Sequence, residues 1–272
     1  MRAVIRKLKG QISQAINPPV RHPDDLASWE KFHELVRSQG SVLLSQLHRF
    51  PESILVAGCQ RSGTTMLSRV FTQSEGMVDF WFGMDDELDA AQILSGWVHR
   101  ECEGRYCFQT TFLNECYPEY FEREADFKLI WLLRNPQSVV YSMVYNWGDF
   151  AFDELYESVG YKARPAGQTG RVSRLEKGCY SYNAKISQIF DIKPHLRDRV
   201  MVVDYDDLVA RREELLPQLY DFVGLAYDPA YVEQIHSRSV NKAERLSDTK
   251  KAQINELCGE AYERCRSLID LT

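Results

Sequence analysis

The sequence predicts a single α/β domain in three layers, with a central, mostly parallel sheet between two layers of helices. Two observations lead to this prediction. Short apolar runs of strand length alternate along the chain with stretches in which apolar residues recur at helical spacing, a pattern that is typical of parallel sheets. The chain has 272 residues, 44% of them hydrophobic and 26% charged, which is enough for one large domain with a substantial core.

The composition excludes several classes of function. A net charge of −6 disfavours a general nucleic-acid binder, so any anion site must be a local group of Arg and Lys. The seven cysteines include no Cys-x-x-Cys pair, which favours reduced thiols in a cytoplasmic protein over disulfides or a zinc site. No early apolar run is long enough for a signal peptide or a transmembrane segment.

The strands are expected at four apolar runs. The first covers residues 53–58 and the second 105–112, while the third begins at Lys128 and the fourth at Arg199. The first expected helix covers residues 64–73, and the second follows the acidic residues at 85–87 and includes Trp97 and His99. Further helices are expected directly after the third strand, at 172–191, in the stretch that ends at Gly224, and after Ser247.

Two further segments flank this pattern. Residues 1–50 are expected to form helical pieces packed on the domain, with a stripe of Trp29, Phe32 and Val36 on a helix capped by Asp24 or Asp25. Residues 148–171 contain four glycines and several aromatics, and we interpret them as a loop-rich cover over a substrate.

The most informative stretch is residues 53–67. Gly58 and Gly63 have the G-x-x-x-x-G spacing of a phosphate-binding loop between a strand and a helix, in which backbone N–H groups surround an anion. A nucleoside triphosphatase has Lys-Ser/Thr after the second glycine, but this chain has Thr64 and Thr65. Its cation is instead Arg61, inside the loop, so the pattern indicates an anionic ester without an obvious metal seat.

A second strand-to-helix junction follows about seventy residues later. Arg134 ends the strand, Asn135 is placed as the N-cap and Pro136 as the first helical residue. Ser142 follows Arg134 by eight residues. Because parallel strands end at the same edge of a sheet, Arg134 is placed at the same edge as the first loop.

These motifs resemble those of the sulfotransferases that use 3′-phosphoadenosine-5′-phosphosulfate (PAPS). The run from Gln60 to Thr65, with Ser62 at its centre, resembles their 5′-phosphosulfate loop, and Arg134 with Ser142 resembles their 3′-phosphate segment. The run Tyr205-Asp-Asp-Leu resembles a box whose tyrosine lies near adenine. The resemblance covers roughly residues 53–225 and implies a P-loop NTPase-like sulfotransferase fold, PAPS as sulfate donor and no metal.

The resemblance does not fix the general base. Some branches of the family use a glutamate beyond the loop, which leaves a choice among carboxylates, and His99 is a further alternative. The candidates are Asp85, Asp86, Glu87 and Glu115. Gln109-Thr-Thr occupies the place where other members have a Lys-Thr-Pro-like triplet or a catalytic histidine, so the histidine mechanism is not carried over.

The function hypothesis is transfer of a sulfuryl group from PAPS to a hydroxyl, or less readily an amine, of a small-molecule, sugar or lipid acceptor. Aromatic residues that could line the acceptor site are Phe80, Trp81, Phe82, Trp147, Phe150 and Phe152. Two alternatives stay open: a kinase using Mg-ATP, because Asp204 ends an apolar strand as in a Walker B motif, and a PAPS-binding protein without catalysis. The sequence leaves the oligomeric state open.

Overall fold

The computed structural model describes residues 28–39, 43–82, 85–101, 103–114, 116–122, 125–235 and 237–271. Within them the chain forms one parallel sheet with the strand order β2-β1-β3-β4. The strands are β1 (Ser53–Gly58), β2 (Cys107–Gln109), β3 (Phe127–Leu133) and β4 (Val200–Asp204). The predicted α/β class is therefore confirmed, although β2 is shorter than the expected strand at 105–112.

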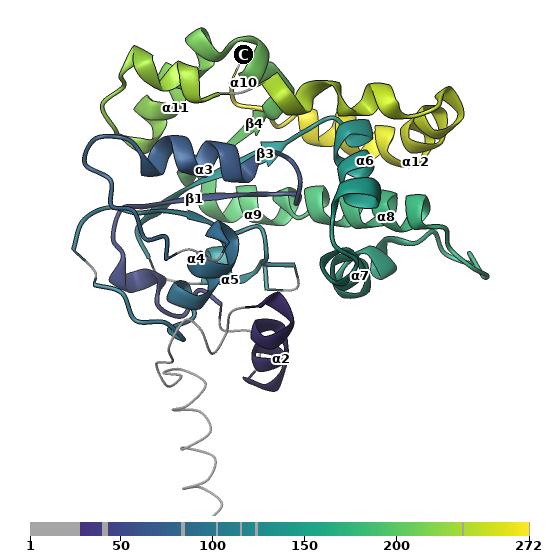
Figure 1. Ribbon diagram of the computed structural model, residues 1–272, viewed down its shortest axis with the longest axis horizontal. Helices are drawn as coiled ribbons and strands as arrows, with labels where there is room; N and C mark the ends of the chain where they lie inside the picture. The colour runs from purple at the N-terminus through teal and green to yellow at the C-terminus, as the bar shows by residue number, and fades with distance from the viewer. Residues whose placement is uncertain are drawn as a thin grey trace, which may run out of the picture.

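Helices cover both faces of the sheet (Figure 1). One face carries α3 (Thr64–Thr72), α10 (Tyr205–Ala210) and α11 (Arg212–Val223). The other face packs against α4 (Asp86–Leu94), α5 (Glu119–Glu122), α6 (Pro136–Asn146), α8 (Arg174–Ser187), α9 (Ile189–Leu196) and α12 (Asp248–Arg266). The α2 helix (Trp29–Gln39) and α7 (Asp149–Ser158) lie beside this second layer. Short 3₁₀ segments are η2 (Leu47–Arg49), η3 (Gly160–Ala163), η4 (Arg197–Arg199), η5 (Pro229–Gln234) and η6 (Ser237–Arg245).

The alternation of side chains along β1 explains why its whole length is apolar. Ile54 and Val56 belong to the core cluster under α3 and α11, whereas Leu55 and Ala57 belong to the cluster on the opposite face. Successive side chains of a strand point to opposite faces, so a strand covered on both sides has no polar position. Because β1 is buried on both faces, its position in the sheet is fixed, and so is the point at which the following loop begins.

Several helix boundaries follow the expected caps. The Asn135 side chain accepts a hydrogen bond from the Gln137 N–H at the start of α6, with Pro136 in the first position. Ser247 caps α12 in the same way through the Lys250 N–H. Gly224 ends α11 in the left-handed conformation, with φ of 68°. These local signals placed the helices correctly.

Two expectations about helices were wrong. The helix that was expected to include Trp97 and His99 ends at Leu94, and Gly96 follows with φ of 81°, a conformation that breaks a helix. The segment 148–171 is not loop-rich, because α7 and η3 occupy much of it. The expected helix within 1–20 and the capping residues Asp24 and Asp25 lie outside the described residues.

Three general properties concern the described residues only. None of their helices combines the length and the apolar character that a membrane crossing requires. Their six cysteines are buried free thiols. No group of three or more His, Cys, Asp or Glu side chains in the described ranges is placed to hold a metal ion.

Candidate active site

The turn between β1 and α3 depends on its two glycines. Gly58 has φ of 131°, and a Cβ there would lie 2.2 Å from the Leu132 carbonyl oxygen of β3. Gly63 has φ of 99°, and its Cβ would lie 2.2 Å from the ring of Tyr205. Only glycine fits both positions, since each combines a positive φ with close contact. Arg61 also has a positive φ, 71°, which costs about 1–2 kcal/mol for a non-glycine residue.

The loop leads into a helix N-terminus that no side chain caps and that suits an anion. Gly63 is the N-cap of α3 and provides no side-chain hydrogen bond to its first turn. The first N–H groups of a helix lack intrahelical partners, and they lie at its positive end. The Ser62 hydroxyl is buried and has no hydrogen-bond partner among the described residues. The N–H groups of this first turn fit a phosphate or sulfate group.

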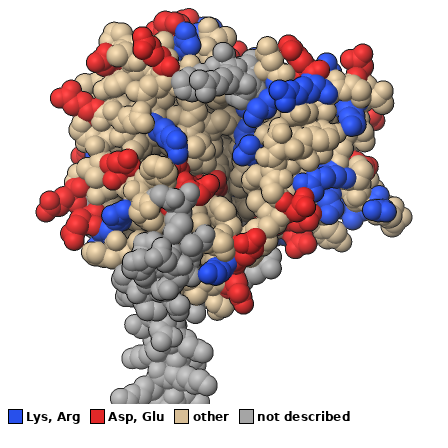
Figure 2. All heavy atoms as spheres, in the orientation of Figure 1, with Lys and Arg blue, Asp and Glu red and all other residues tan. Residues whose placement is uncertain are grey.

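A cavity of about 490 Å³ lies beside this loop at the carboxyl ends of β1 and β3. Figure 2 shows a hollow in this face of the molecule, with basic side chains on both sides and carboxylates at its lower edge. The residues that line the cavity come from many parts of the chain. They are Trp29, Gln60, Arg61, Gly63, Thr64, Thr65, Asp85, Glu87, Gln109, Phe112, Asn114, Arg134, Ser142, Trp147, Phe150, Ala151, Glu154 and Lys242.

Arg134 is held rigidly at the end of β3. Its side chain is 2% exposed, and its Nη1 donates to the Arg61 carbonyl oxygen over 3.2 Å. The guanidinium lies 3.4 Å from an Asp206 carboxylate oxygen and 4.4 Å from the centre of the Tyr205 ring. The Tyr182 hydroxyl donates to the Arg134 carbonyl oxygen. The contacts fix both the backbone and the charge of Arg134 at the cavity wall.

Two more cationic side chains lie near Arg134. Arg61 donates from Nε to the Ser142 hydroxyl oxygen over 3.0 Å, which joins the loop to α6. Lys242, from η6, reaches the same cavity. Burial lowers the pKa of Lys242, and the charges of Arg61, Arg134 and Arg245 lower it further. These three positive charges make this part of the cavity lining suitable for an anionic ligand.

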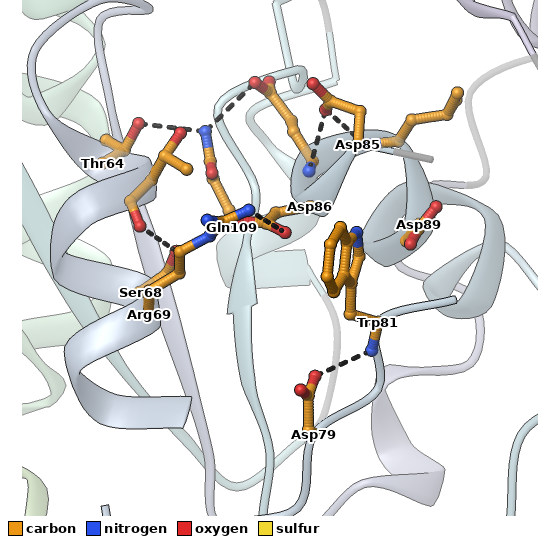
Figure 3. A network of polar contacts seen from close by, with 12 residues as sticks. Thr64, Ser68, Arg69, Asp79, Trp81, Asp85, Asp86, Asp89 and Gln109 are labelled. Carbon is orange, nitrogen blue, oxygen red and sulfur yellow. Dashed lines mark hydrogen bonds and ion pairs between the residues drawn. The ribbon is translucent and has the colours of Figure 1, made fainter. Parts of the chain in front are cut away.

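The structure separates the three neighbouring acids at the start of α4. Asp85 is the N-cap and accepts hydrogen bonds from the N–H groups of Glu87 and Leu88. Asp86 pairs with Arg69 at 2.6 Å and does not line the cavity. Figure 3 shows both arrangements. Among these acids Glu87 is the cavity-lining carboxylate that is not used as a helix cap.

The Gln109 side chain links Glu87 to Thr64, the residue that follows the phosphate loop. Figure 3 shows its contact with Thr64. Its Nε2 lies 3.0 Å from the Thr64 hydroxyl oxygen, 3.2 Å from Glu87 Oε2 and 3.4 Å from the Thr111 hydroxyl oxygen. An amide nitrogen has two hydrogens to donate. When Thr64 accepts one of them, its own O–H is left to donate elsewhere, so Gln109 orients both Thr64 and the carboxylate.

The environment of Glu87 suits a proton acceptor. Burial raises the pKa of its carboxyl to about 7, and the nearby charge of Asp85 contributes to the rise. A hydrogen bond with Thr111 and the charges of Lys185 and Arg61 lower the pKa and oppose the rise. A carboxyl group with a pKa near neutrality can take up a proton at working pH much better than an ordinary surface carboxylate.

If Glu87 is the base, activity should depend on its deprotonated fraction. With a pKa of about 7, kcat is expected to fall as the pH drops below 7 and to level off above about pH 8. A pH profile of the initial rate, measured with saturating donor, tests this expectation. A rate that stays constant between pH 5 and 8 would contradict it.

Lys185 is a buried cation behind the cavity wall. It is 1% exposed, and its ammonium donates to the Leu113 carbonyl oxygen over 2.8 Å. Burial lowers the pKa of Lys185 to about 8, while the charge of Glu87 opposes this shift. Lys185 thus holds the segment after β2 and stabilises the carboxylate form of Glu87. Burial also raises the pKa of Cys59, which keeps this thiol protonated.

Replacing Lys185 by methionine removes this positive charge at similar side-chain length. Since Lys185 lowers the pKa of Glu87, we expect the midpoint of the pH–rate profile to move to higher pH, by up to about one unit. Lys177→Met provides a control, because Lys177 lies on the same helix and pairs with Asp153 outside the cavity. An unchanged midpoint in Lys185→Met would show that the two groups are not coupled.

The other residues singled out from the sequence have different positions. Tyr205 is 2% exposed and packs between Gly63 and the Arg134 guanidinium, and neither Tyr205 nor Ser62 lines the cavity. His99 is exposed and lies 3.8 Å from Glu101. Glu115 lies outside the described residues. The role of Tyr205 near adenine stays a prediction.

Aromatic side chains form part of the cavity wall. Trp147 and Phe150 were expected from the sequence, whereas Trp29 and Phe112 were not. Phe80 and Phe152 are core residues, and Trp81 lies under Arg69 outside the cavity. Four residues that were expected at the acceptor site do not line this cavity: Phe80, Trp81, Phe82 and Phe152.

The comparisons with known proteins agree with this geometry. The model of the sulfotransferase domain family matches residues 51–261. The chain belongs to this family. Carbohydrate sulfotransferase 1 of Danio rerio is 26% identical over 113 residues, a match that covers 41% of this chain and 26% of that protein. The family membership supports a transferase.

Solved sulfotransferase structures are similar to this chain in fold. A sulfotransferase from Alicyclobacillus acidocaldarius matches with a TM-score of 0.50 at 14% identity, covering 80% of this chain and 95% of that one. A mouse sulfotransferase in complex with PAP matches with a TM-score of 0.48 at 14% identity, covering 84% and 93%. The predicted sulfotransferase fold is confirmed.

Proposed function

We propose that this sulfotransferase transfers a sulfuryl group from PAPS to a hydroxyl of a small-molecule or sugar acceptor. The observation that carries the proposal is the meeting of Arg61, Arg134 and Lys242 in one cavity, next to the free end of α3. These three cations come from separate elements and repel one another. A nucleotide with phosphate groups at both its 3′ and its 5′ end offsets this repulsion at two points.

The two ends of the donor are assigned to different elements. Arg134 and Ser142 would hold the 3′-phosphate, with Lys242 as a third contact. The 59–63 loop, Arg61 and the first turn of α3 would hold the 5′ end through backbone N–H groups. Gln60, Thr64 and Thr65 line the same part of the cavity. We assign Ser62, Gly63 and Tyr205 to the shaping of the loop.

PAPS supplies a sulfuryl group bound to a phosphate oxygen through a reactive phosphosulfate bond. During transfer the acceptor oxygen forms a bond to sulfur, the bond to the phosphate oxygen breaks, and its electron pair leaves with that oxygen. Arg61, the loop N–H groups and the Thr64 hydroxyl are donors that can stabilise the charge that develops there. Glu87 takes the proton of the acceptor hydroxyl, and hydrogen bonds with Gln109 and Thr111 hold the Glu87 carboxylate in place.

The kinase alternative is less well supported. Asp204, the Walker B-like residue, accepts hydrogen bonds from the N–H groups of Asp206 and Asp207 and from the Tyr262 hydroxyl at 2.7 Å. These contacts occupy the carboxylate as a helix cap, away from the cavity lining. The loop also has no lysine in the Walker position. We therefore favour PAPS over Mg-ATP.

Two measurements test the proposed function. Calorimetric titration with 3′,5′-diphosphoadenosine (PAP) and with Mg-ATP separates a PAPS site from a kinase site, and we expect much tighter binding of PAP. Transfer of labelled sulfate from PAPS to a panel of hydroxyl acceptors separates an enzyme from a protein that only binds PAPS. Binding of Mg-ATP in preference to PAP would overturn the proposal.

The buried thiols are the basis for proposing a cytoplasmic location.

A further inference from the structure

Part of the cavity wall is built by three segments that are far apart in the sequence. Trp29 of α2 stacks on Phe112, with ring centroids 4.3 Å apart. His33 lies edge-on to both Phe112 and Phe150, at 6.2 and 6.1 Å. Because Trp29, Phe112 and Phe150 all line the cavity, these contacts define one aromatic wall between α2 and α7.

Glu154 is the charged residue in this wall. Its carboxylate lies 2.9 Å from Nε2 of His33, and the two side chains are 10% and 12% exposed. Glu154 also lines the cavity. A carboxylate buried to this degree interacts with a ligand more strongly than a surface carboxylate, since little water screens it.

Glu154 is the charged lining residue at the aromatic wall, and its sign is negative. The cations of the cavity lining in the described residues are Arg61, Arg134 and Lys242, which we assign to the nucleotide. The remaining charged lining residues are all acidic: Asp85 and Glu87 interact with Arg61, and Glu154 lies in the aromatic wall. An acceptor with a carboxylate or sulfate group would meet like charge there, whereas an ammonium group would meet opposite charge.

The uncharged part of the lining favours a ligand with many hydrogen-bond donors and one apolar face. Buried amide oxygens need donors, and Oε1 of both Gln60 and Gln109 has no hydrogen-bond partner in the described part of the chain. The rings of Trp29, Phe112 and Phe150 offer flat apolar surface to the C–H groups of a sugar and electron-rich faces to a cation.

We propose that the acceptor is an amino sugar or a related amino polyol, with its protonated amine on the Glu154 side and its reacting hydroxyl towards Glu87. Glu154 is then the residue that determines acceptor specificity. This inference rests on the proposed function and adds the chemical class of the acceptor to it. The bonds formed and broken are those described above, with the hydroxyl proton passing to Glu87.

Binding to the PAP complex tests the proposal without requiring turnover. Glucosamine, N-acetylglucosamine and glucuronic acid, which are cationic, neutral and anionic at neutral pH, are titrated into the wild-type protein saturated with PAP. We expect affinity to fall in that order, with about a five- to tenfold preference for glucosamine over N-acetylglucosamine. Glu154→Gln should remove most of this preference. Glu157→Gln, an exposed position on the same helix, is the matched control and should keep it.

Each result bears on one of the two proposals. Failure of the wild-type protein to bind PAP contradicts the proposed function itself. If PAP binds, then equal affinity for the three sugars, a preference for glucuronic acid or no binding of any of them overturns the acceptor inference. The wild-type ranking decides this even if Glu154→Gln does not fold, and retention of the preference in a folded Glu154→Gln overturns the role of that residue.

Discussion

Replacing Glu87 by glutamine is expected to lower kcat by about 10²–10⁴-fold, the usual contribution of a positioned general base. Glutamine keeps the size of the side chain and its contact with Gln109, but it cannot take up the acceptor proton. The affinity for PAP should change little, because the proposed nucleotide contacts come from Arg61, Arg134 and Lys242. Single-turnover transfer of labelled sulfate, together with PAP titration, measures the two quantities separately.

The same substitution has a predictable effect on stability. The pKa of Glu87 is raised from 4.5 to about 7 in the folded protein, so the protonated form stabilises the fold fully below about pH 4.5. This contribution is lost as the pH rises through 7. Glu87→Gln should therefore have a higher Tm than the wild type at pH 8, and a smaller difference at pH 5. A large loss of kcat together with this Tm pattern would show that Glu87 is needed for catalysis although its charged form destabilises the fold.

The control for Glu87 is its neighbour Asp86, which pairs with Arg69 outside the cavity. Asp86→Asn removes a charge from the same turn of α4 but not from the cavity. We expect its kcat to stay within about threefold of the wild type, as is usual for a partly exposed ion pair. Equal losses in both variants would mean that the start of α4 matters only for folding.

Arg134→Ala is expected to weaken PAP binding by about 10²–10³-fold, as for the loss of one partner from a buried charge pair. Binding of adenosine 5′-phosphosulfate, which has no 3′-phosphate, should weaken far less. The difference arises because the proposed contacts of Arg134 are with the 3′-phosphate alone. Isothermal titration of both nucleotides against both proteins gives the four affinities that are needed.

Arg134 is buried next to Asp206, so its loss also affects the fold. Arg134→Lys retains a charge and serves as a second variant if the alanine variant is unstable. Arg69→Ala, at an exposed arginine outside the cavity, controls for the loss of a positive charge. Parallel losses for the two nucleotides in the Arg134 variants would exclude the 3′-phosphate assignment.

The parts of the site that could be predicted from the sequence are those encoded locally. The loop from Gly58 to Gly63 contains its own strand, turn and helix start, and Arg134 with Ser142 lies on one strand-to-helix junction. In such segments the spacing of the residues determines their geometry. The parallel sheet then brings both junctions to one edge, which is a property of the fold class.

The remaining parts of the site depend on contacts between distant segments. Lys185 reaches the cavity wall from α8 through Leu113, and Glu154 meets His33 from α2. Nothing in the local sequence of these residues distinguishes them from ordinary helix positions. Glu87 could be separated from Asp85 and Asp86 only after the capping geometry of α4 was known.

Two signals in the sequence could have been used better. Gly96 follows the last apolar position of α4, and a glycine there is the usual sign of a helix end. In α7 the buried residues Phe152, Leu155 and Tyr156 are spaced three and four apart, which is the pattern of an amphipathic helix. The glycines that follow in the segment concealed this periodicity.

The wide spacing in the sequence of the residues around the cavity has a consequence for folding. Arg61, Arg134 and Lys242 belong to the start, the middle and the end of the described fold, so a partly folded chain cannot hold the nucleotide. Saturating PAP should then stabilise the native state as a whole, by about 2.7 kcal/mol at a hundredfold excess over its Kd. Amide hydrogen exchange would report this as slower exchange even in α11, none of whose residues lines the cavity.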